Sequence, residues 1–409
     1  IDELGLDDAT YLFKLLDSEL TAEALMEINE DDREKILKNL SAEEIADELD
    51  ELDTDDAADI ISELPQERVT EVISELEDDE HAKDIVELLR YEEGTAGSIM
   101  AKELVKVKET WMVPTCVRKM RSQAQEVRRV HSIYVVDQDN HLIGRLSLKD
   151  LLVASAKDKV ANIYIPKVDS VHFNDKGEDV ARLMQKYDLE AIPVVDDDNV
   201  LIGRITIDDI VDLIKEEAEK DYQMAAGITE DIDADDSIWN KTKARLPWLI
   251  LGLVGGLAAA SIMGGFDDAL TQFPELFYFT PLIAAMAGNV GVQSSAIIVQ
   301  GLANDNIRGS MMNRMFKEIG LSMINGVILA VLIFVFGFFL DYNINISITI
   351  SISMIMVIIL ASLIGTFVPL ILDKNGIDPA VATGPFITTS NDIFGIFIFF
   401  YIAKVILGF

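Results

Sequence analysis

Five long apolar segments in the C-terminal part of the chain constrain its fold more than any other feature. They cover residues 247–265, 278–302, 318–340, 346–372 and 380–408. Each is close to or above the roughly 20 residues that an α-helix needs to cross a bilayer. Apolar runs of this length are rare among the buried helices of soluble proteins. The sequence therefore predicts a multi-domain membrane protein that ends in a transmembrane domain of five helices, residues 247–409.

Basic residues beside these segments predict their orientation, because cytoplasmic loops are enriched in Lys and Arg. Those before the first segment and between the second and third are Lys241, Lys243, Arg245, Arg308, Arg314 and Lys317. The loops around Asp267 and Asp341 contain neither Lys nor Arg. The pattern predicts a multi-pass protein of the cell inner (plasma) membrane, with a cytoplasmic N-terminus and the C-terminus outside. Five helices make a thin wall for a pore, which favours a homodimer with the pathway on its two-fold axis.

The part of the chain before the apolar segments is strongly acidic. The formal net charge of the whole chain is −37, and residues 1–245 carry 62 acidic and 29 basic residues of the totals of 71 and 34. Such a charge repels nucleic acid, which argues against a nucleic acid partner, and it attracts cations. A plain solvated acidic surface is the alternative interpretation. Cys116 is the sole cysteine, so an intrachain disulfide and a cysteine-rich metal site are excluded. The chain begins at Ile1 rather than Met, so we expect a missing N-terminal stretch, and no signal peptide is visible.

Residues 1–95 predict an all-α N-terminal domain built from short helices. Leucine and isoleucine recur at helical spacing in runs of about ten residues, and turns such as residues 53–56 and 65–67 separate the runs. The apolar positions are expected to form the core. The acidic residues of this domain are interpreted as a solvated face rather than a metal site.

Residues 96–215 contain an internal repeat. The segments 132–151 and 191–210 match with an offset of 59 residues, and each reads as strand, acidic turn, strand and helix. The pattern resembles a tandem pair of α/β CBS domains. The resemblance implies a regulatory module that binds nucleotides or ions in its clefts. In adenosine-binding members a Ser or Thr and an Asp three residues later hold the ribose, and the matching positions are Ser147, Asp150, Thr206 and Asp209.

The alternative for these four residues is purely structural. Ser147 and Thr206 would then cap helices, and the two aspartates would lie in the first helical turn, where the helix dipole favours them. Residues 216–246 follow the repeat and are predicted to form a connecting helix before the membrane domain. An acidic break, residues 229–236, interrupts this segment.

Asp392 lies close to the middle of the fifth apolar segment. A carboxylate at that depth is expensive in lipid and marks a functional site by default, although a structural Asp bonded to a neighbouring helix is the alternative. Two copies of Asp392 across a dimer axis would match the charge of one divalent ion. The polar residues predicted to line the same pathway are Asn289, Gln293, Thr388, Thr389 and Asn391.

The ligand types favour Mg²⁺. An all-oxygen site with few carboxylates suits an ion that dehydrates reluctantly and keeps several waters. The cysteine and histidine ligands expected for zinc or copper are missing from the apolar segments. Ca²⁺ and Mn²⁺ fit equally well by ligand type.

Over essentially its whole length the chain resembles the MgtE family of bacterial magnesium channels. The specific motifs are Gly-Asn-Val-Gly-Val-Gln-Ser at 288–294 and, near the fifth segment, Asp378-Pro379-Ala380, Gly384-Pro385 and Ser390-Asn391-Asp392. The resemblance implies a homodimer that passes Mg²⁺ down its gradient, with Asp392 as the pore carboxylate. Val292 and Gly384 depart from the polar residues of some members, so selectivity and ion hydration could differ.

The same resemblance implies regulation by cytoplasmic Mg²⁺, which bridges acidic surfaces of the N domain, the CBS pair and the connecting helix and locks the pore shut. The implied regulatory ligands are Asp196, Asp198, Asp208, Glu230, Asp231, Asp233, Asp235 and Asp236. The physical logic is general, because divalent ions remove the repulsion between apposed acidic surfaces. ATP at the CBS pair, seen in some members, is a further implied ligand.

Two other functions remain open at this point. A divalent cation exchanger or carrier would use the same membrane residues. A membrane-anchored ion or nucleotide sensor would use the CBS pair but has no need of a mid-membrane charge at Asp392. An enzyme is not expected, because the sequence contains no apparent nucleophile–base pair or phosphate-binding loop.

Overall fold

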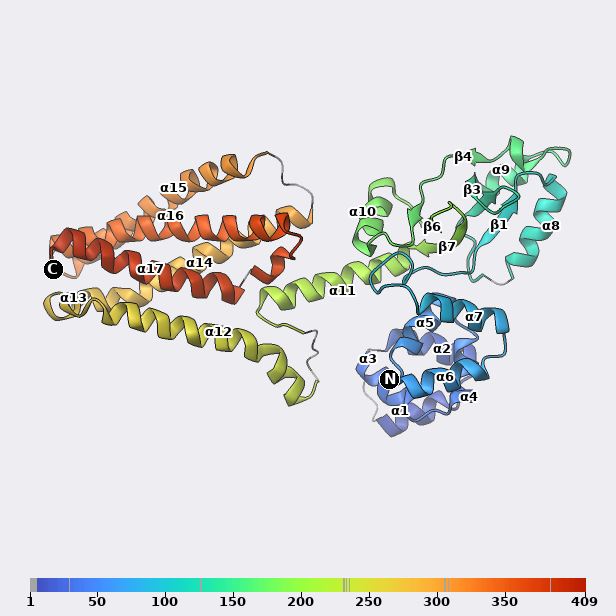
Figure 1. The fold of residues 1–409 in the computed structure, drawn as a ribbon, viewed down its shortest axis with the longest axis horizontal. Coiled ribbons are helices and arrows are strands. Elements are labelled where there is room, and N and C mark those ends of the chain that lie inside the picture. The colour runs from blue at the N-terminus through green and yellow to red at the C-terminus, as the bar shows by residue number, and fades with distance from the viewer. Residues whose placement is uncertain are drawn as a thin grey trace. The chain divides into compact units, whose positions relative to one another are not determined.

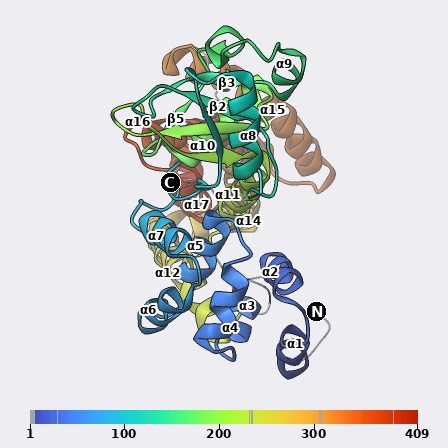
Figure 2. The ribbon, with the colours of Figure 1, turned by 90° about the vertical axis from the view of Figure 1, so that its right-hand side faces the viewer.

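The computed structural model describes residues 6–28, 30–125, 127–230, 232, 234, 236–304, 307, 309–382 and 384–409. The chain divides into two compact units, residues 1–216 and residues 217–409. Figure 1 shows the elements of each unit, and Figure 2 shows them after a 90° rotation.

The first part of unit one is a stack of short helices, as the spacing of leucine and isoleucine predicts. The helices are α1 (Leu6–Phe13), α2 (Ser18–Glu27), α3 (Glu30–Leu37), α4 (Ala42–Leu49), α5 (Thr54–Ser62), α6 (Gln66–Glu75) and α7 (Asp79–Leu88). Side chains accept hydrogen bonds from the unpaired N–H groups in the first turns of three helices. Ser41 and Glu44 form a capping box on α4, and Asp17 and Asp78 cap α2 and α7. The apolar stripes, including Leu49 of α4, pack into one core.

The second part of unit one contains two small sheets, which confirm the predicted CBS pair. The first sheet has the order β1 (Val105–Lys108), β2 (Ile133–Val136), β3 (Leu142–Leu146), β4 (Ile165–Pro166), and the second has the order β5 (Val171–His172), β6 (Ala191–Val195), β7 (Leu201–Thr206). In each sheet the first pair of strands is parallel and the second antiparallel. The helices are α8 (Val113–Gln123), α9 (Leu148–Val153), α10 (Gly177–Tyr187) and the start of α11 (Ile207–Ala225).

The two repeats are joined at their acidic turns. The backbone N–H of Leu142 donates to the carbonyl of Asn199 at 3.0 Å, and that of Leu201 donates to the carbonyl of Asn140 at 3.2 Å. Asn140 and Asn199 have φ of 68° and 64°, a left-handed conformation that asparagine tolerates better than most residues. The offset of 59 residues therefore corresponds to a pseudo-symmetric pair of strand turns.

Unit two confirms the five predicted membrane helices. They are α12 (Ile238–Gly264), α14 (Glu275–Ala303), α15 (Met311–Phe339), α16 (Ile344–Lys374) and α17 (Gly384–Leu407), and all five are long and apolar enough to span a membrane. Helix α13 (Asp267–Gln272) lies between the first two. The predicted connecting helix, 216–246, is divided between the second half of α11 and the start of α12.

Helices α14 and α16 approach each other closely at two glycines. A Cβ atom on Gly365 would lie 2.3 Å from the carbonyl oxygen of Gly291. Because that oxygen belongs to the backbone, a change of side-chain rotamer cannot remove the clash. We expect Gly365→Ala to separate the two helices and to cost about 1–3 kcal/mol, as overpacking typically does. Thermal unfolding of the purified chain measures the effect. Gly320→Ala on α15 is the control, because a Cβ there meets no atom within 4 Å. Equal midpoints for the two variants would contradict the tight contact.

Candidate functional site

The carboxylate of Asp392 lies where α17 crosses a small residue of α14. Asp392 is partly buried, and its Oδ1 is 3.8 Å from the position that a Cβ on Gly288 would take. The methyl group of Thr388, one turn earlier on α17, is 3.6 Å from the same position. The glycine thus leaves room for one acidic and one hydroxyl side chain beside α14.

The other residues predicted to line the pathway fall into two groups. Asn289 and Gln293 are exposed on one face of α14, as their spacing of four residues predicts. Thr389 packs its methyl group against Gly255 of α12, and Asn391 is 1% exposed with its amide against Gly291. Thr388 donates its hydroxyl hydrogen to the carbonyls of Gly384 and Pro385 at 3.2 and 3.1 Å, which leaves its oxygen free to accept. The role of all five residues in the pathway stays a prediction.

A second group of acidic residues gathers inside unit one, between α5 of the N domain and the start of α11. Asp53, Asp55 and Asp56 come from the N-terminal end of α5, and Asp208 and Asp209 come from the first turn of α11. We call these five residues the interdomain acids. Asp55 is 8% exposed, and both it and Asp56 interact electrostatically with Asp209.

Among the residues that the structure describes, the cations near the interdomain acids are too few to neutralise them. Arg204, 5% exposed, donates to the carboxylate of Asp53 at 3.3 Å. The charge of Arg128 also reaches Asp53 and Asp56, and its guanidinium donates to the carbonyl of Glu51 at 3.0 Å. Two arginines against five carboxylates leave an excess of negative charge in a largely buried place.

The pKa values of the interdomain acids record this excess. Burial, followed by Asp209 and other neighbouring acids, raises the pKa of Asp55 well above its usual value and that of Asp56 to about 6. Burial also raises the pKa of Asp209, against the hydrogen bonds that it accepts from the backbone N–H and hydroxyl of Thr206 at 2.9 and 2.7 Å. For Asp208 burial, the largest single effect, works in the same upward direction. The hydrogen bonds from Thr206 and from its own backbone N–H, together with the charges of His131 and Arg204, outweigh burial, so the pKa of Asp208 is lowered. An unneutralised group of this kind is a candidate divalent cation site.

These shifts predict a pH dependence. In the folded chain Asp56 and, next to it on α5, Asp59 have pKa values of about 6 and about 7, against 3.8 for an ordinary Asp. The folded state therefore binds more protons between about pH 4 and 7, and its stability falls as the pH rises through this window. We expect the thermal midpoint of the full chain in EDTA to fall from pH 5 to pH 8, and Mg²⁺ to raise it more at pH 8. Asp56→Asn with Asp59→Asn should flatten both responses; unchanged profiles in this variant would contradict the assignment.

The predicted regulatory residues have varied surroundings. Asp196 accepts hydrogen bonds from the N–H groups of Asp198 and Val200 at 3.0 and 2.8 Å, and thus holds its own turn, while the side chain of Asp198 is exposed. In unit two, Glu230 pairs with Lys243 at 2.7 Å, and Asp236 accepts from Asn240 at 3.3 Å. Asp231, Asp233 and Asp235 lie outside the described residues. Of the predicted set, Asp208 is the one that the structure brings into the interdomain acids.

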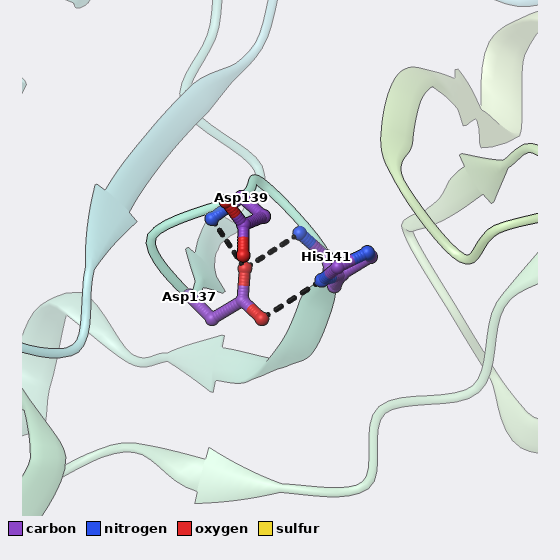
Figure 3. Close-up of side chains that lie close together, drawn as sticks. All are labelled: Asp137, Asp139 and His141. Carbon is purple, nitrogen blue, oxygen red and sulfur yellow. Dashed lines mark hydrogen bonds and ion pairs between the residues drawn. The ribbon is translucent and has the colours of Figure 1, made fainter.

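A cluster of Asp137, Asp139 and His141 occupies the equivalent turn of the first repeat (Figure 3). Asp137 accepts from the N–H groups of Asp139 and His141 at 2.9 and 3.0 Å, and its other oxygen lies 2.8 Å from Nδ1 of His141. This hydrogen bond raises the pKa of His141 and lowers that of Asp137. The arrangement repeats that of Asp196, so its contacts are those of a turn.

Of the predicted nucleotide residues, Ser147, Thr206 and Asp209 are hydrogen-bonded within their own turns, and Asp150 is half-buried in the first turn of α9. Ser147 accepts from the N–H of Lys149 at 3.2 Å and caps α9, while Thr206 bonds Asp209 as described above. A cavity of about 340 Å³ adjoins the second pair. Its lining residues are Arg129, His131, Ile207, Asp208, Val211 and Asp212.

The acids of α5 were missed by the sequence interpretation, which assigned residues 53–56 to a solvated turn. A signal was present: Asp55 lies three residues, about one helical turn, from both Leu52 and Ala58, which are buried apolar residues. An acid on the buried side of an amphipathic helix faces another element, and here Asp55 faces Asp209 of the CBS pair.

Comparisons with known proteins agree with this architecture. A family model described as a divalent cation transporter, MgtE, matches residues 280–402, a model of the MgtE intracellular N domain matches 1–94, and the CBS domain model matches 96–157 and 160–216. The magnesium transporter MgtE of Bacillus subtilis (strain 168) is 35% identical over 317 residues, 77% of this chain and 70% of that protein. The magnesium transporter MgtE of Enterococcus faecalis is 36% identical over 325 residues, 78% of this chain and 71% of that protein.

Two solved structures are similar to the part before the membrane helices. One is a crystal structure of the soluble part of a magnesium transporter, 36% identical with a TM-score of 0.49, which covers 53% of this chain and 85% of that one. The other is the cytosolic domain of the Mg²⁺ channel MgtE in complex with ATP, 35% identical with a TM-score of 0.49, which covers 52% of this chain and 86% of that one.

Proposed function

This chain belongs to the MgtE family of divalent cation transporters, and from that premise we propose that it carries Mg²⁺ across a membrane as a homodimer gated by cytoplasmic Mg²⁺. It is a transporter rather than an enzyme. The observation that carries the proposal is the carboxylate of Asp392, held inside a membrane helix beside Gly288. A charge in that position is costly unless a cation or a polar pathway compensates it.

The homodimer follows from the polar face of α14. Asn289 and Gln293 are exposed on a helix that is otherwise apolar enough to span the membrane. Amide groups are unfavourable in contact with lipid tails, so a second copy of the chain is the partner that we propose for this face. Two such faces would enclose a polar pathway with two copies of Asp392, whose joint charge equals that of one Mg²⁺ with opposite sign.

Gating is proposed at the interdomain acids. With internal Mg²⁺ scarce, repulsion between the acids of α5 and those of α11 favours separation of the N domain from the CBS pair. Bound Mg²⁺ removes the repulsion and favours the closed arrangement, which shifts the equilibrium of the whole chain. We extend the ligand set predicted from the sequence by Asp53, Asp55 and Asp56, and we keep Asp196, Asp198, Glu230 and Asp236 as candidates for further bridging ions.

An adenine nucleotide is proposed as a second cytoplasmic ligand, in the cavity beside Thr206. Its volume lies within the range of small-molecule sites. Arg129 offers a charge for phosphates, and Ile207 and Val211 offer apolar walls, whereas Asp208 and Asp212 would repel phosphates unless Mg²⁺ accompanies them. Calorimetric titration of the full chain with ATP in the presence of Mg²⁺ tests this ligand.

The membrane orientation and the domain limits also remain proposals. The first turns of α12 contain Lys241 and Lys243, and those of α15 contain Arg314 and Lys317; these basic residues favour a cytoplasmic location for both helix ends. That orientation leaves the C-terminus outside. We retain residues 1–95, 96–215, 216–246 and 247–409 as the functional divisions.

The test of transport is Mg²⁺ uptake in a Mg²⁺-auxotrophic bacterial strain that expresses the chain. Growth at low external Mg²⁺ is expected, and competition by Mn²⁺, Co²⁺ or Ca²⁺ measures selectivity. Single-channel currents in a patch distinguish a channel from an exchanger or carrier. The test of gating is protease protection of residues 1–216 in the full chain with and without millimolar Mg²⁺. Equal cleavage rates would remove the gating proposal while leaving the transport proposal intact.

A further inference from the structure

A second carboxylate lies inside the membrane domain, away from Asp392. Glu318 is the eighth residue of α15, about 10 Å along the helix axis from its first residue. The hydroxyl of Ser294 on α14 donates to Oε1 of Glu318 at 2.7 Å, and Ser294 is 6% exposed. Ser294 and Gly288 are six residues apart, about 120° around the helix, so Glu318 approaches a different face of α14 from Asp392.

Helix α16 adds a hydroxyl at the same level. The hydroxyls of Ser322 on α15 and Ser362 on α16 are hydrogen-bonded, and the two helices run in opposite directions. One turn from this pair, toward the start of α15 and the end of α16, lie Glu318 and Thr366. Thr366 is 1% exposed, and its Oγ1 has no hydrogen-bond partner among the described residues. Its neighbour Gly365 is in close contact with Ser294, since a Cβ on Gly365 would lie 3.1 Å from the Cβ of Ser294.

Three helices therefore contribute oxygen atoms near one level of the domain: a partly buried carboxylate from α15, a buried hydroxyl from α14 and a buried hydroxyl from α16. A buried polar group without a partner is costly, and within the described part of the chain the hydroxyl of Ser294 is the one side-chain donor to Glu318. A small cation that is coordinated by oxygen atoms would compensate the charge of the carboxylate and give the hydroxyl of Thr366 a partner.

We propose that Glu318, Ser294 and Thr366 form a monovalent cation site within each protomer, with Na⁺ as the ion that it takes. One carboxylate and two neutral hydroxyls carry a single negative charge, which a monovalent cation neutralises. A divalent cation would leave an uncompensated positive charge among apolar helices. The close contact of Gly291 with Gly365 beside the site leaves little room, which favours Na⁺ over the larger K⁺.

The competing occupant is the guanidinium of Arg314, which lies one turn from Glu318 toward the start of α15. If Arg314 neutralised Glu318, the protomer would have no need of a bound ion. The site is independent of the proposed Mg²⁺ pathway, because it is complete within one protomer and does not include Asp392.

The experiment is thermal unfolding of the full chain in lipid nanodiscs, with Mg²⁺ removed by EDTA. NaCl, KCl and N-methyl-D-glucamine chloride are titrated at constant ionic strength. We expect a saturable rise of the midpoint with Na⁺ that N-methyl-D-glucamine does not produce. Glu318→Gln and Thr366→Val should abolish the Na⁺ response, whereas Thr366→Ser should retain it. Ser362→Ala, which removes the neighbouring hydroxyl pair, and Asp392→Asn should also retain it.

Three results would overturn the proposal. Equal midpoints in Na⁺ and N-methyl-D-glucamine for the wild type would mean that Glu318 is satisfied by Arg314 or by a proton. A Na⁺ response that persists in both Glu318→Gln and Thr366→Val would locate the ion elsewhere. A response to added Mg²⁺, but not Na⁺, that is lost in Glu318→Gln would show a divalent site instead.

Discussion

Replacing Asp392 with alanine is expected to reduce Mg²⁺ uptake to the background of the auxotrophic strain. The carboxylate is the charge that compensates a dehydrating or hydrated cation at mid-membrane. Its removal forfeits several kcal/mol of electrostatic stabilisation, which corresponds to a loss of at least about a hundredfold in rate. The measurement is uptake at low external Mg²⁺, together with growth on the same medium, at matched expression in the membrane fraction.

Two further variants separate charge from packing. Asp392→Asn keeps the shape of the side chain beside Gly288 and removes its charge, so it should fail as Asp392→Ala does. Asp373→Ala removes an exposed acid at the end of α16 and should transport normally. Growth rescue by Asp392→Ala at wild-type rates would exclude the pore role and leave the structural interpretation of this aspartate.

Neutralising the interdomain acids is expected to abolish the Mg²⁺ dependence of protease cleavage. In the variant Asp55→Asn, Asp56→Asn, Asp209→Asn, most of the repulsion that Mg²⁺ relieves is gone, and so are three of the five interdomain acids. For the wild type we expect Mg²⁺ to slow cleavage of residues 1–216 by a factor in the usual range of coupling energies, about 5- to 150-fold. The variant should be cleaved at one rate with and without Mg²⁺.

The control for this variant removes the same number of charges from the same domain. Glu43→Gln, Asp47→Asn and Glu71→Gln are exposed on α4 and α6, away from the CBS pair. This control should keep the wild-type response. Loss of the response in the control would mean that the total charge of the N domain, rather than the interdomain acids, senses the ion.

The periodic parts of this chain could be predicted because each contains its own signal. Five apolar runs predict five helices, and an offset of 59 residues predicts two copies of one α/β motif, since both patterns are local. Asp392 could be found because its cost in lipid depends on depth alone. Asp55 and Glu318 could not be found in this way. Their importance depends on what faces them: Asp209 lies more than 150 residues from Asp55 in the sequence, and Ser294 lies on another helix.

The starts of the helices were also beyond the sequence patterns. Helix α12 begins at Ile238, several residues before the apolar run, because Ser237 caps it. The basic residues Lys241, Lys243 and Arg245 are compatible with a helix at the membrane surface. Hydropathy locates the part of a helix inside the bilayer, whereas the capping residue determines where the helix begins.

The contact of Gly291 with Gly365 limits which parts of the membrane domain are able to move. Helices α14 and α16 are in backbone contact there, and 39% of the most apolar stretch of each is buried, so we expect the two helices to move as one body. Of the corresponding stretch of α12, only 11% is buried. We therefore expect a pathway that widens and narrows to do so by tilting of α12, while α14 and α16 keep their positions relative to each other.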